Sequence, residues 1–296
     1  MTPLLFALPG NETLGADLCR LRGWEQGRWE LRAFPDGESH VRFLSDVAGR
    51  DLVLVCSLDR PNDKTVPLYL TACVARELGA ARIGLVVPYL AYMRQDARFH
   101  GGEGVTAQHF ARLLGMAGDW LVTVDPHLHR IHSLDEIYAI PTRVVAAAPA
   151  IAAWVGAHVC NPLLIGPDEE SDQWVGDVAR LVGCPYTTLR KERRGDRDVT
   201  VSVPALAQWR GRTPVLVDDI ASTARTMIAA VARVREADMD PPVCIAVHAL
   251  FAADAYAELQ AAGVAGVACT NTIAHASNRI DVAPLLGVAA ASLLGE

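Results

Sequence analysis

Residues 215–227 read Val-Leu-Val-Asp-Asp-Ile-Ala-Ser-Thr-Ala-Arg-Thr-Met, and this stretch decides the fold. Its first three residues are apolar and predict a buried strand. The two aspartates and the small residues after them predict a tight polar turn. Met227, Val231 and Val234 then recur at the spacing of one helix face, so a helix is expected to follow. A strand that leads through a turn into a helix is the repeating unit of α/β proteins.

The predicted turn combines two kinds of binding group. A turn that opens a helix presents unpaired backbone N–H groups and the positive end of the helix dipole, which together suit a phosphate. Asp218 and Asp219 suit hydroxyl groups or a cation instead. These features indicate a sugar-phosphate site, although two aspartates followed by Ser222 and Thr223 are also ordinary helix-capping chemistry. The segment alone does not separate the two explanations.

The composition bounds the class of protein. The chain has 296 residues, of which 51% are hydrophobic, enough for one large domain or two of ordinary size. No apolar run is long enough to cross a bilayer, and Met1–Leu8 lacks the basic segment and the cleavage site of a signal peptide. The net charge of −7 provides no general attraction for nucleic acid. We therefore expect neither a membrane nor a nucleic acid as a partner.

The cysteines indicate the cellular compartment. There are seven of them, an odd number, and no two are spaced Cys-x-x-Cys. This pattern favours free thiols over disulfides or a zinc site. The sequence therefore predicts a cytoplasmic protein.

Apolar strand patterns alternate with helical patterns along the whole chain, which predicts an α/β fold with a parallel sheet. The expected strands of the first half are Leu4–Leu8, Trp29–Phe34, Leu52–Ser57, Ile83–Val87 and Trp120–Val124. Those of the second half are Pro162–Ile165, Tyr186–Leu189, Val215–Val217, Val243–Leu250 and Val264–Thr272. Between the halves, the alanine- and proline-rich segment Pro141–Ala153 predicts a junction, so we expect two domains, residues 1–145 and 146–296.

Polar residues follow several of these strands. Ligands of parallel sheets gather at the carboxyl ends of the strands, which is where these clusters lie. They are Asp36 with Glu38, Asn62 with Asp63, Arg94–Asp96, and Asp125 with His127. The loop Arg190–Arg197 holds five cations, and a solvated surface loop is the usual explanation of such a run.

Taken in order, these segments resemble the ribose-phosphate diphosphokinase family, also called the phosphoribosyl pyrophosphate synthetases, along nearly the whole chain. The resemblance is carried by Phe34-Pro35-Asp36-Gly37-Glu38, Pro61-Asn62-Asp63, Pro88–Asp96, Asp125-Pro126-His127, Pro167-Asp168, Lys191-Glu192-Arg193 and Val217–Thr226. It implies two phosphoribosyltransferase-like domains, each a mostly parallel sheet flanked by helices. The first would carry most ATP-site motifs, and the second the pyrophosphate loop, the catalytic loop and the ribose-5-phosphate loop.

The resemblance also implies a reaction. The β,γ-diphosphoryl group of Mg-ATP would pass to the anomeric hydroxyl of ribose 5-phosphate and leave AMP, a transfer that depends on positioning and charge neutralisation. The cofactor would be Mg²⁺. A homo-oligomer built from dimers is implied as well, because family members share adenine contacts across a subunit interface.

Each site residue takes its role from the segment that it matches. ATP would be bound by Phe34, Asp36, Glu38, Arg94, Gln95, Asp96 and His127. Ribose 5-phosphate would be bound by Asp218, Asp219, Ser222, Thr223, Ala224, Arg225 and Thr226. The metal would be held by His127, Asp168 and Asp125, and the catalytic residues would be Lys191 and Arg193.

Two departures from the family pattern leave the acceptor open. Ala224-Arg225 stands where the family usually has Gly-Gly, and alanine fits there only if its φ is negative. Arg225 either contacts the phosphate or faces solvent. In the pyrophosphate loop, Glu169 and Glu170 repel a diphosphate unless metal or Arg193 neutralises them or they point away.

Three functions therefore fit the sequence. The first is an active ribose-5-phosphate diphosphokinase. The second is a homologue with an altered acceptor or reduced activity, and the third is a non-catalytic partner that regulates an active synthetase. The presence of five residues of the family's segments favours catalysis over the third function: Lys191, Arg193, Asp218, Asp219 and His127. A phosphoribosyltransferase would also carry an Asp-Asp phosphate loop, but it would not need the ATP stretch Arg94–Asp96.

Overall fold

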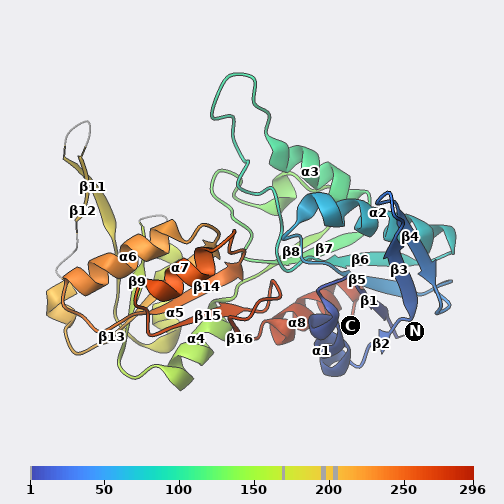
Figure 1. The fold of residues 1–296 in the computed structure, drawn as a ribbon. Coiled ribbons are helices and arrows are strands. Elements are labelled where there is room, and N and C mark those ends of the chain that lie inside the picture. Colours follow the sequence, from blue (N-terminus) through green and yellow to red (C-terminus); the bar gives the residue numbers. More distant parts are fainter. Residues whose placement is uncertain (1, 169–170, 195–197, 203–205) are drawn as a thin grey trace. The chain divides into compact units, whose positions relative to one another are not determined.

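Two six-stranded parallel sheets form the centre of the fold in the computed structural model (Figure 1). The structure describes residues 2–168, 171–194, 198–202 and 206–296, and for residues 190–194 and 198–202 it describes the backbone only. The chain divides into two compact units. The first contains Met1–Ala146, Thr272–Ala274 and Val282–Glu296, and the second contains Ala147–Asn271 and His275–Asp281.

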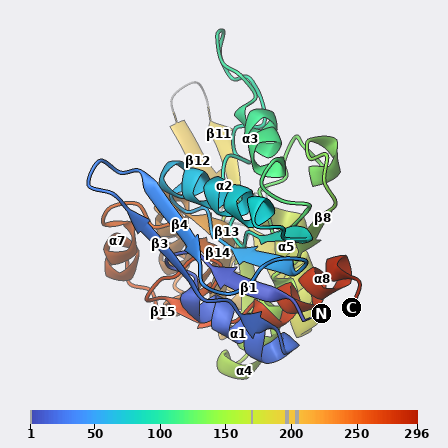
Figure 2. The same cartoon turned by 90° about the vertical axis from the view of Figure 1, so that its right-hand side faces the viewer.

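The first sheet has the strand order β2-β1-β5-β6-β7-β8, and all its neighbours are parallel. Its strands are β1 (Leu4–Ala7), β2 (Glu25–Gln26), β5 (Asp51–Val55), β6 (Arg82–Val86), β7 (Trp120–Val124) and β8 (Thr142–Val145). Figures 1 and 2 show helices on both faces of this sheet. On one face lie α2 (Pro61–Glu77) and α3 (Thr106–Gly115), and on the other lie α1 (Glu12–Arg22) and α8 (Ala283–Leu294).

Cover on both faces explains why the central strands of this sheet are apolar along their length. All five residues of β7 are buried, and so are four of the five in β5. Gly84 of β6 lies opposite Trp120 of β7 in the sheet. A Cβ atom at Gly84 would lie 1.8 Å from the Trp120 indole, so the ring occupies the space that a side chain would need.

The second sheet repeats this plan with the order β10-β9-β13-β14-β15-β16, again parallel throughout. Its strands are β9 (Pro162–Gly166), β10 (Tyr186–Thr188), β13 (Thr213–Ala221), β14 (Val243–Ala249), β15 (Gly266–Thr270) and β16 (Asn278–Ile280). Its helices are α4 (Ala148–His158), α5 (Asp172–Val182), α6 (Arg225–Glu236) and α7 (Ala255–Ala261). The predicted apolar face of α6 is confirmed, because Met227, Val231 and Val234 are all buried. The fold class predicted from the sequence is thus the one observed.

Each unit also carries an antiparallel hairpin. In the first it is β3 (Trp29–Ala33) with β4 (Ser39–Phe43), and in the second β11 (Arg190–Arg194) with β12 (Asp198–Ser202). The first hairpin corrects an expectation, since the strand predicted near Trp29–Phe34 does not join the parallel sheet. The chain turns back tightly after it: the Phe34 amide donates to the Glu38 carbonyl over 2.7 Å. The short strand β2, instead of β3, pairs with β1 in the parallel sheet.

Helices α4 and α8 each pack in a different unit from the strand that they follow. Helix α8 follows β16 of the second unit but packs against α1, β6, β7 and β8 of the first. Helix α4 follows β8 of the first unit but packs against α5 and β16 of the second. The domain boundary between residues 145 and 146 stays a prediction. Helix α8 lies after this boundary in the sequence, but it packs in the first unit. The predicted junction Pro141–Ala153 also contains β8 and the start of α4.

No helix in the described part of the chain is long and apolar enough to span a membrane.

Candidate active site

Strand β13 carries both predicted acceptor carboxylates. It continues through Asp218 and Asp219 to Ala221, where it still pairs with β14, so the predicted tight turn begins only at residue 222. The Asp219 amide donates to Asp218 Oδ1 over 3.0 Å. Burial, together with the nearby charges of Asp219 and Asp168, raises the pKa of Asp218 to about 8. Three carboxylates therefore gather where β13 ends, with a surplus of negative charge that a bound cation would relieve.

Residues 222–224 form the turn between β13 and α6. Its start is fixed by the loop after β14, whose Phe251 and Ala252 amides donate to the carbonyls of Ala221 (2.8 Å) and Ser222 (3.0 Å). Ala224 then adopts a left-handed conformation, with φ 54° and ψ 6°, directly before the helix. A left-handed residue at a helix N-terminus turns successive amides toward one point, which is a favourable arrangement for an anion.

The positive φ of Ala224 is a finding that the sequence did not provide. The condition under which alanine was expected to fit, a negative φ, is not met. The methyl group is nevertheless buried, in a core cluster with Met227 and Val231, and this burial offsets part of the conformational cost. Arg225 begins α6 with an exposed side chain, and Thr223 and Thr226 are exposed as well. All three side chains are therefore accessible to a ligand.

Asp168 follows β9 in the second unit. The Ser171 amide donates to Asp168 Oδ1 over 3.3 Å, and the Ser171 hydroxyl donates to the Asp168 carbonyl over 2.6 Å. A Cβ atom at Gly166 would lie 2.3 Å from Ser171 Oγ, so this turn requires glycine at the end of β9. Glu169 and Glu170, which the sequence places in the same loop, lie outside the described residues.

The predicted catalytic residues Lys191 and Arg193 lie on β11. Their backbones pair with Val201 and Val199 of β12. The first part of the charged run, Arg190–Arg194, therefore forms a strand rather than an irregular loop. The side chains of Lys191 and Arg193 lie outside the described part of the structure, so their catalytic role stays a prediction.

In the first unit, the predicted adenine segment is the turn of the β3–β4 hairpin. Phe34 is 38% exposed, and the Arg32 guanidinium lies 4.4 Å from its ring centroid. Asp36 Oδ1 accepts the Glu38 amide over 3.2 Å. The segment is thus a rigid turn that presents an aromatic ring beside a cation.

The loop between β6 and α3 contains Arg94, Gln95 and Asp96. Arg94 and Gln95 are exposed, whereas Asp96 is buried and pairs with Arg130. Burial alone would raise the pKa of Asp96, but hydrogen bonds from the Arg130 main chain and side chain outweigh it and hold the pKa below its ordinary value. The sequence motifs do not point to Arg130; the available signal is its place in a strand-end loop shortly after His127.

The loop after β7 contains Asp125 and His127. Asp125 has a φ of 32°, and its amide donates to the Val145 carbonyl of β8 over 3.0 Å. The His127 ring is half-buried, with its centroid 6.4 Å from that of His129. The structure thus places these two predicted metal residues in the first unit, and the third, Asp168, in the second.

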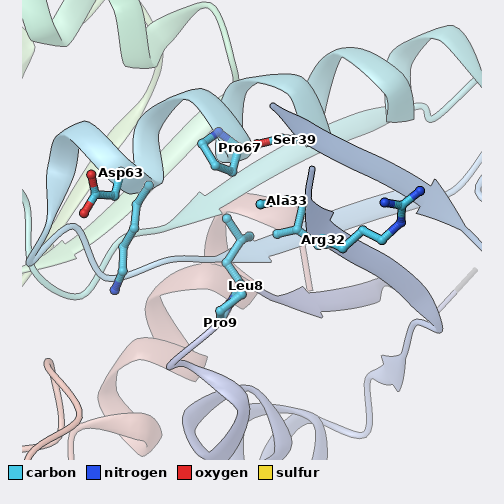
Figure 3. A pocket seen from close by; sticks show the side chains of 9 residues that line it. Leu8, Pro9, Arg32, Ala33, Ser39, Asp63 and Pro67 are labelled. Carbon is cyan, nitrogen blue, oxygen red and sulfur yellow. The ribbon is translucent and has the colours of Figure 1, made fainter. Parts of the chain in front are cut away.

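A pocket of about 210 Å³ lies between the β3–β4 hairpin, α2 and the end of β1 (Figure 3). Its lining is Leu8, Pro9, Leu31, Arg32, Ala33, Ser39, Asp63, Lys64 and Pro67. Figure 3 shows Pro67 of α2 facing Leu8 and Ala33, while the Arg32 guanidinium points away. None of the predicted ATP-binding residues is among its lining residues.

The carboxylates of Asp218, Asp219 and Asp168 have the chemistry that Mg²⁺ prefers in its ligands. Within the described residues, no group of three or more His, Cys, Asp or Glu side chains has the geometry of a metal site. Burial first, and then the nearby carboxylates of Asp219 and Asp168, raise the pKa of Asp218, so a cation bound there would favour its ionised form. Carboxylate oxygens are the ligands that Mg²⁺ prefers, whereas histidine is less usual.

Comparison with known proteins shows the family. The family model described as the N-terminal domain of ribose phosphate pyrophosphokinase matches residues 4–118, and that of the phosphoribosyl transferase domain matches residues 133–283. The chain is 34% identical over 295 residues to the ribose-phosphate pyrophosphokinase of Methanopyrus kandleri, covering 99% of this chain and 100% of that protein. It is 32% identical over 287 residues to the enzyme of that name from Halobacterium salinarum, covering 96% and 99%.

A solved structure shows the same fold. The phosphoribosylpyrophosphate synthetase from Mycobacterium smegmatis superposes with a TM-score of 0.86 at 24% identity, covering 100% of this chain and 99% of that one. The sequence matches and the shared fold both extend over nearly the whole chain. The chain therefore belongs to the ribose-phosphate pyrophosphokinase family of enzymes.

Proposed function

We propose that this protein transfers the β,γ-diphosphoryl group of Mg-ATP to the anomeric hydroxyl of ribose 5-phosphate, giving phosphoribosyl pyrophosphate and AMP. One observation carries the proposal: the carboxylates of Asp218 and Asp219 adjoin a turn whose left-handed Ala224 opens helix α6. Hydroxyl-binding groups thus lie beside phosphate-binding groups. The family of the chain and the names of its relatives support the same reaction.

In the acceptor half, Asp218 and Asp219 accept hydrogen bonds from the ribose hydroxyls. The amides that open α6 bind the 5-phosphate, with the hydroxyls of Ser222, Thr223 and Thr226. Arg225 adds a positive charge at the same helix end. These roles require no movement of β13, because its pairing with β14 already fixes the backbone.

In the donor half, Phe34, Asp36 and Glu38 form the adenine segment, and Arg94, Gln95 and His127 bind the phosphates. We propose that adenine contacts are shared across a subunit interface, so that the working enzyme is a homo-oligomer built from dimers. Light scattering of the purified protein tests this point, and a monomer at all concentrations would contradict it. A cytoplasmic location is part of the same proposal.

The residues proposed as Mg²⁺ ligands are Asp125 and His127 in the first unit and Asp168 in the second. When bound, Mg²⁺ neutralises the transferring diphosphoryl group and the carboxylates around it. Lys191 and Arg193 close over the transferring group and stabilise its charge. Such positioning and charge neutralisation supply most of what phosphoryl transfer requires from a protein.

One assay tests the proposal. Purified protein is incubated with Mg-ATP and ribose 5-phosphate, and AMP and phosphoribosyl pyrophosphate are quantified, with omission of the sugar phosphate as the control. Equal amounts of both products support the proposed reaction. If no AMP forms with any pentose phosphate, both enzymatic proposals fail and a regulatory partner becomes the remaining function.

A second candidate is an enzyme with an altered acceptor. The observation that favours it is the pair Ala224 and Arg225, which gives the phosphate turn a left-handed alanine and an exposed cation. The same assay with a series of pentose phosphates separates the two candidates. A higher kcat/KM for another sugar phosphate than for ribose 5-phosphate would support the second.

A further inference from the structure

A single buried carboxylate links two strand-end loops of the first unit. Asp96, in the loop between β6 and α3, has a side chain that is only 3% exposed. Its Oδ2 accepts the Arg130 amide over 3.0 Å, and its Oδ1 accepts Arg130 Nη1 over 3.1 Å. Arg130 lies in the loop after β7. One aspartate thus holds both the main chain and the side chain of the same residue in the neighbouring loop.

The linked loops carry three of the proposed ATP-binding side chains. Arg94 and Gln95 directly precede Asp96 and are exposed, and His127 lies three residues before Arg130. Figures 1 and 2 show that the loop between β6 and α3 extends well beyond the sheet. A loop of this length needs fixed points if its side chains are to keep a defined distance from those of another loop.

Other contacts fix the remaining ends of the first loop. Tyr92 is left-handed, with φ 65°, and its ring lies 4.5 Å from that of Phe110. The Ala107 amide donates to the Gln95 carbonyl over 3.2 Å, which attaches the loop to the start of α3. The Arg130 guanidinium also lies 5.2 Å from the Phe99 ring centroid. Asp96 provides the link from this anchored loop to the His127 loop.

The geometry leaves Asp96 poorly suited to bind a nucleotide. Both of its oxygens are engaged by Arg130, and a nearly unexposed carboxylate offers a ligand little surface. A charged group whose partners are both supplied by one residue acts as a support for that residue. The exposed neighbours Arg94 and Gln95 remain accessible to ATP.

We propose that Asp96 is a positioning residue, which holds Arg94 and Gln95 at a fixed distance from His127, rather than a ligand of ATP. The inference rests on the proposed function, since it assigns these residues to the ATP site. It differs from the role that the sequence resemblance implied for Asp96.

The kinetic test uses Asp96→Asn, Arg130→Ala and the double variant. Loss of a supporting group typically costs about 10- to 100-fold, so Asp96→Asn is expected to raise the KM for ATP by that factor and to leave the KM for ribose 5-phosphate nearly unchanged. Arg130→Ala should reproduce part of the effect, because its main-chain amide remains. The double variant should be no worse than Asp96→Asn, because the two residues act through one contact.

A control with the same kinds of hydrogen bond, although 38% exposed, is available at the amino ends of the strands of the same sheet. Asp119 directly precedes β7 and accepts the Ile83 amide over 2.7 Å and Arg76 Nη2 over 3.1 Å. It therefore makes the same two kinds of bond as Asp96 at the amino ends of the strands. Asp119→Asn is expected to leave the KM for ATP unchanged. If Arg130→Ala leaves that KM unchanged and Asp96→Asn raises it, Asp96 is a direct ligand and the proposal is overturned.

Hydrogen exchange tests the link without any activity. Asp96→Asn should speed exchange in the peptide that spans residues 125–133 relative to wild type, and Asp119→Asn should not. Unchanged exchange in that peptide overturns the proposal. If wild type produces no AMP while this exchange difference is present, the proposed function fails and the structural link stands, so the two failures are distinguishable. Should Asp96→Asn fail to fold, Arg130→Ala is measured in the same way, with the same two outcomes.

Discussion

Replacement of Ala224 by glycine tests the left-handed conformation at the phosphate turn. With φ 54°, alanine is expected to cost about 1–2 kcal/mol relative to glycine. The substitution removes this cost, but it also removes the methyl group of a residue that is only 6% exposed, a loss of about 0.8 kcal/mol. The greater freedom of glycine in the unfolded chain costs a further 0.5–1 kcal/mol, roughly. These terms nearly cancel, so Ala224→Gly should change the free energy of unfolding by less than about 1 kcal/mol.

Ala230 supplies the matched control for that measurement. It is also buried, at 2% exposure against 6% for Ala224, belongs to the same core cluster, and lies inside helix α6. Glycine there loses about 1 kcal/mol of helix propensity and about 0.8 kcal/mol of methyl burial, so Ala230→Gly should cost nearly 2 kcal/mol. Both variants are unfolded in urea, with tryptophan fluorescence as the probe. If Ala224→Gly costs as much as Ala230→Gly, the strain assigned to Ala224 is refuted.

Three further predictions concern charge, packing and catalysis. The folded-state pKa of Asp218 is raised to about 8, above its value near 4 in the unfolded chain, so the folded state loses stability as pH rises between those values. Asp218→Asn should therefore stabilise the unliganded protein more at pH 9 than at pH 5, and thermal unfolding should show a difference of at least about 1 kcal/mol. An equal stabilisation at both pH values would contradict the raised pKa of Asp218. Gly84→Ala should destabilise the first unit by about 3 kcal/mol or more in urea, because its Cβ would overlap the Trp120 ring; near-wild-type stability would show that the ring can move. Lys191→Ala should lower kcat roughly a hundredfold with little change in either KM, and nearly normal turnover would exclude Lys191 from catalysis.

Local sequence patterns predicted helices and strands well where the burial of an apolar face alone determines them. The face of α6 that carries Met227, Val231 and Val234 was readable, because its period directly reflects which side meets the core. The end of β13 was not, since polar residues continue the strand there. Its extension depends on pairing with β14, such as Ile220 with His248, and no local signal reports that register.

Local sequence patterns are limited in the same way for the residues of the candidate site. The predicted segments around Asp96 did not include its partner Arg130, which lies 34 residues away in sequence and belongs to no recognised segment. The conformation of Ala224 could not be read either, because alanine ordinarily avoids positive φ. Both cases are tertiary effects, in which the fold imposes a contact or a backbone angle that the residue types do not favour by themselves.

The return of α8 to the first unit has a consequence for how the chain is made. The second unit contains no residue beyond Asp281, whereas the first is completed only by α8, at residues 283–294. The first unit to be synthesised is therefore the last to be finished. Growth of the chain from residue 146 to residue 294 takes on the order of ten seconds at typical rates of synthesis. During that time the side of α1 that later packs against α8 lacks its cover, so its apolar residues stay exposed to solvent until synthesis is nearly complete.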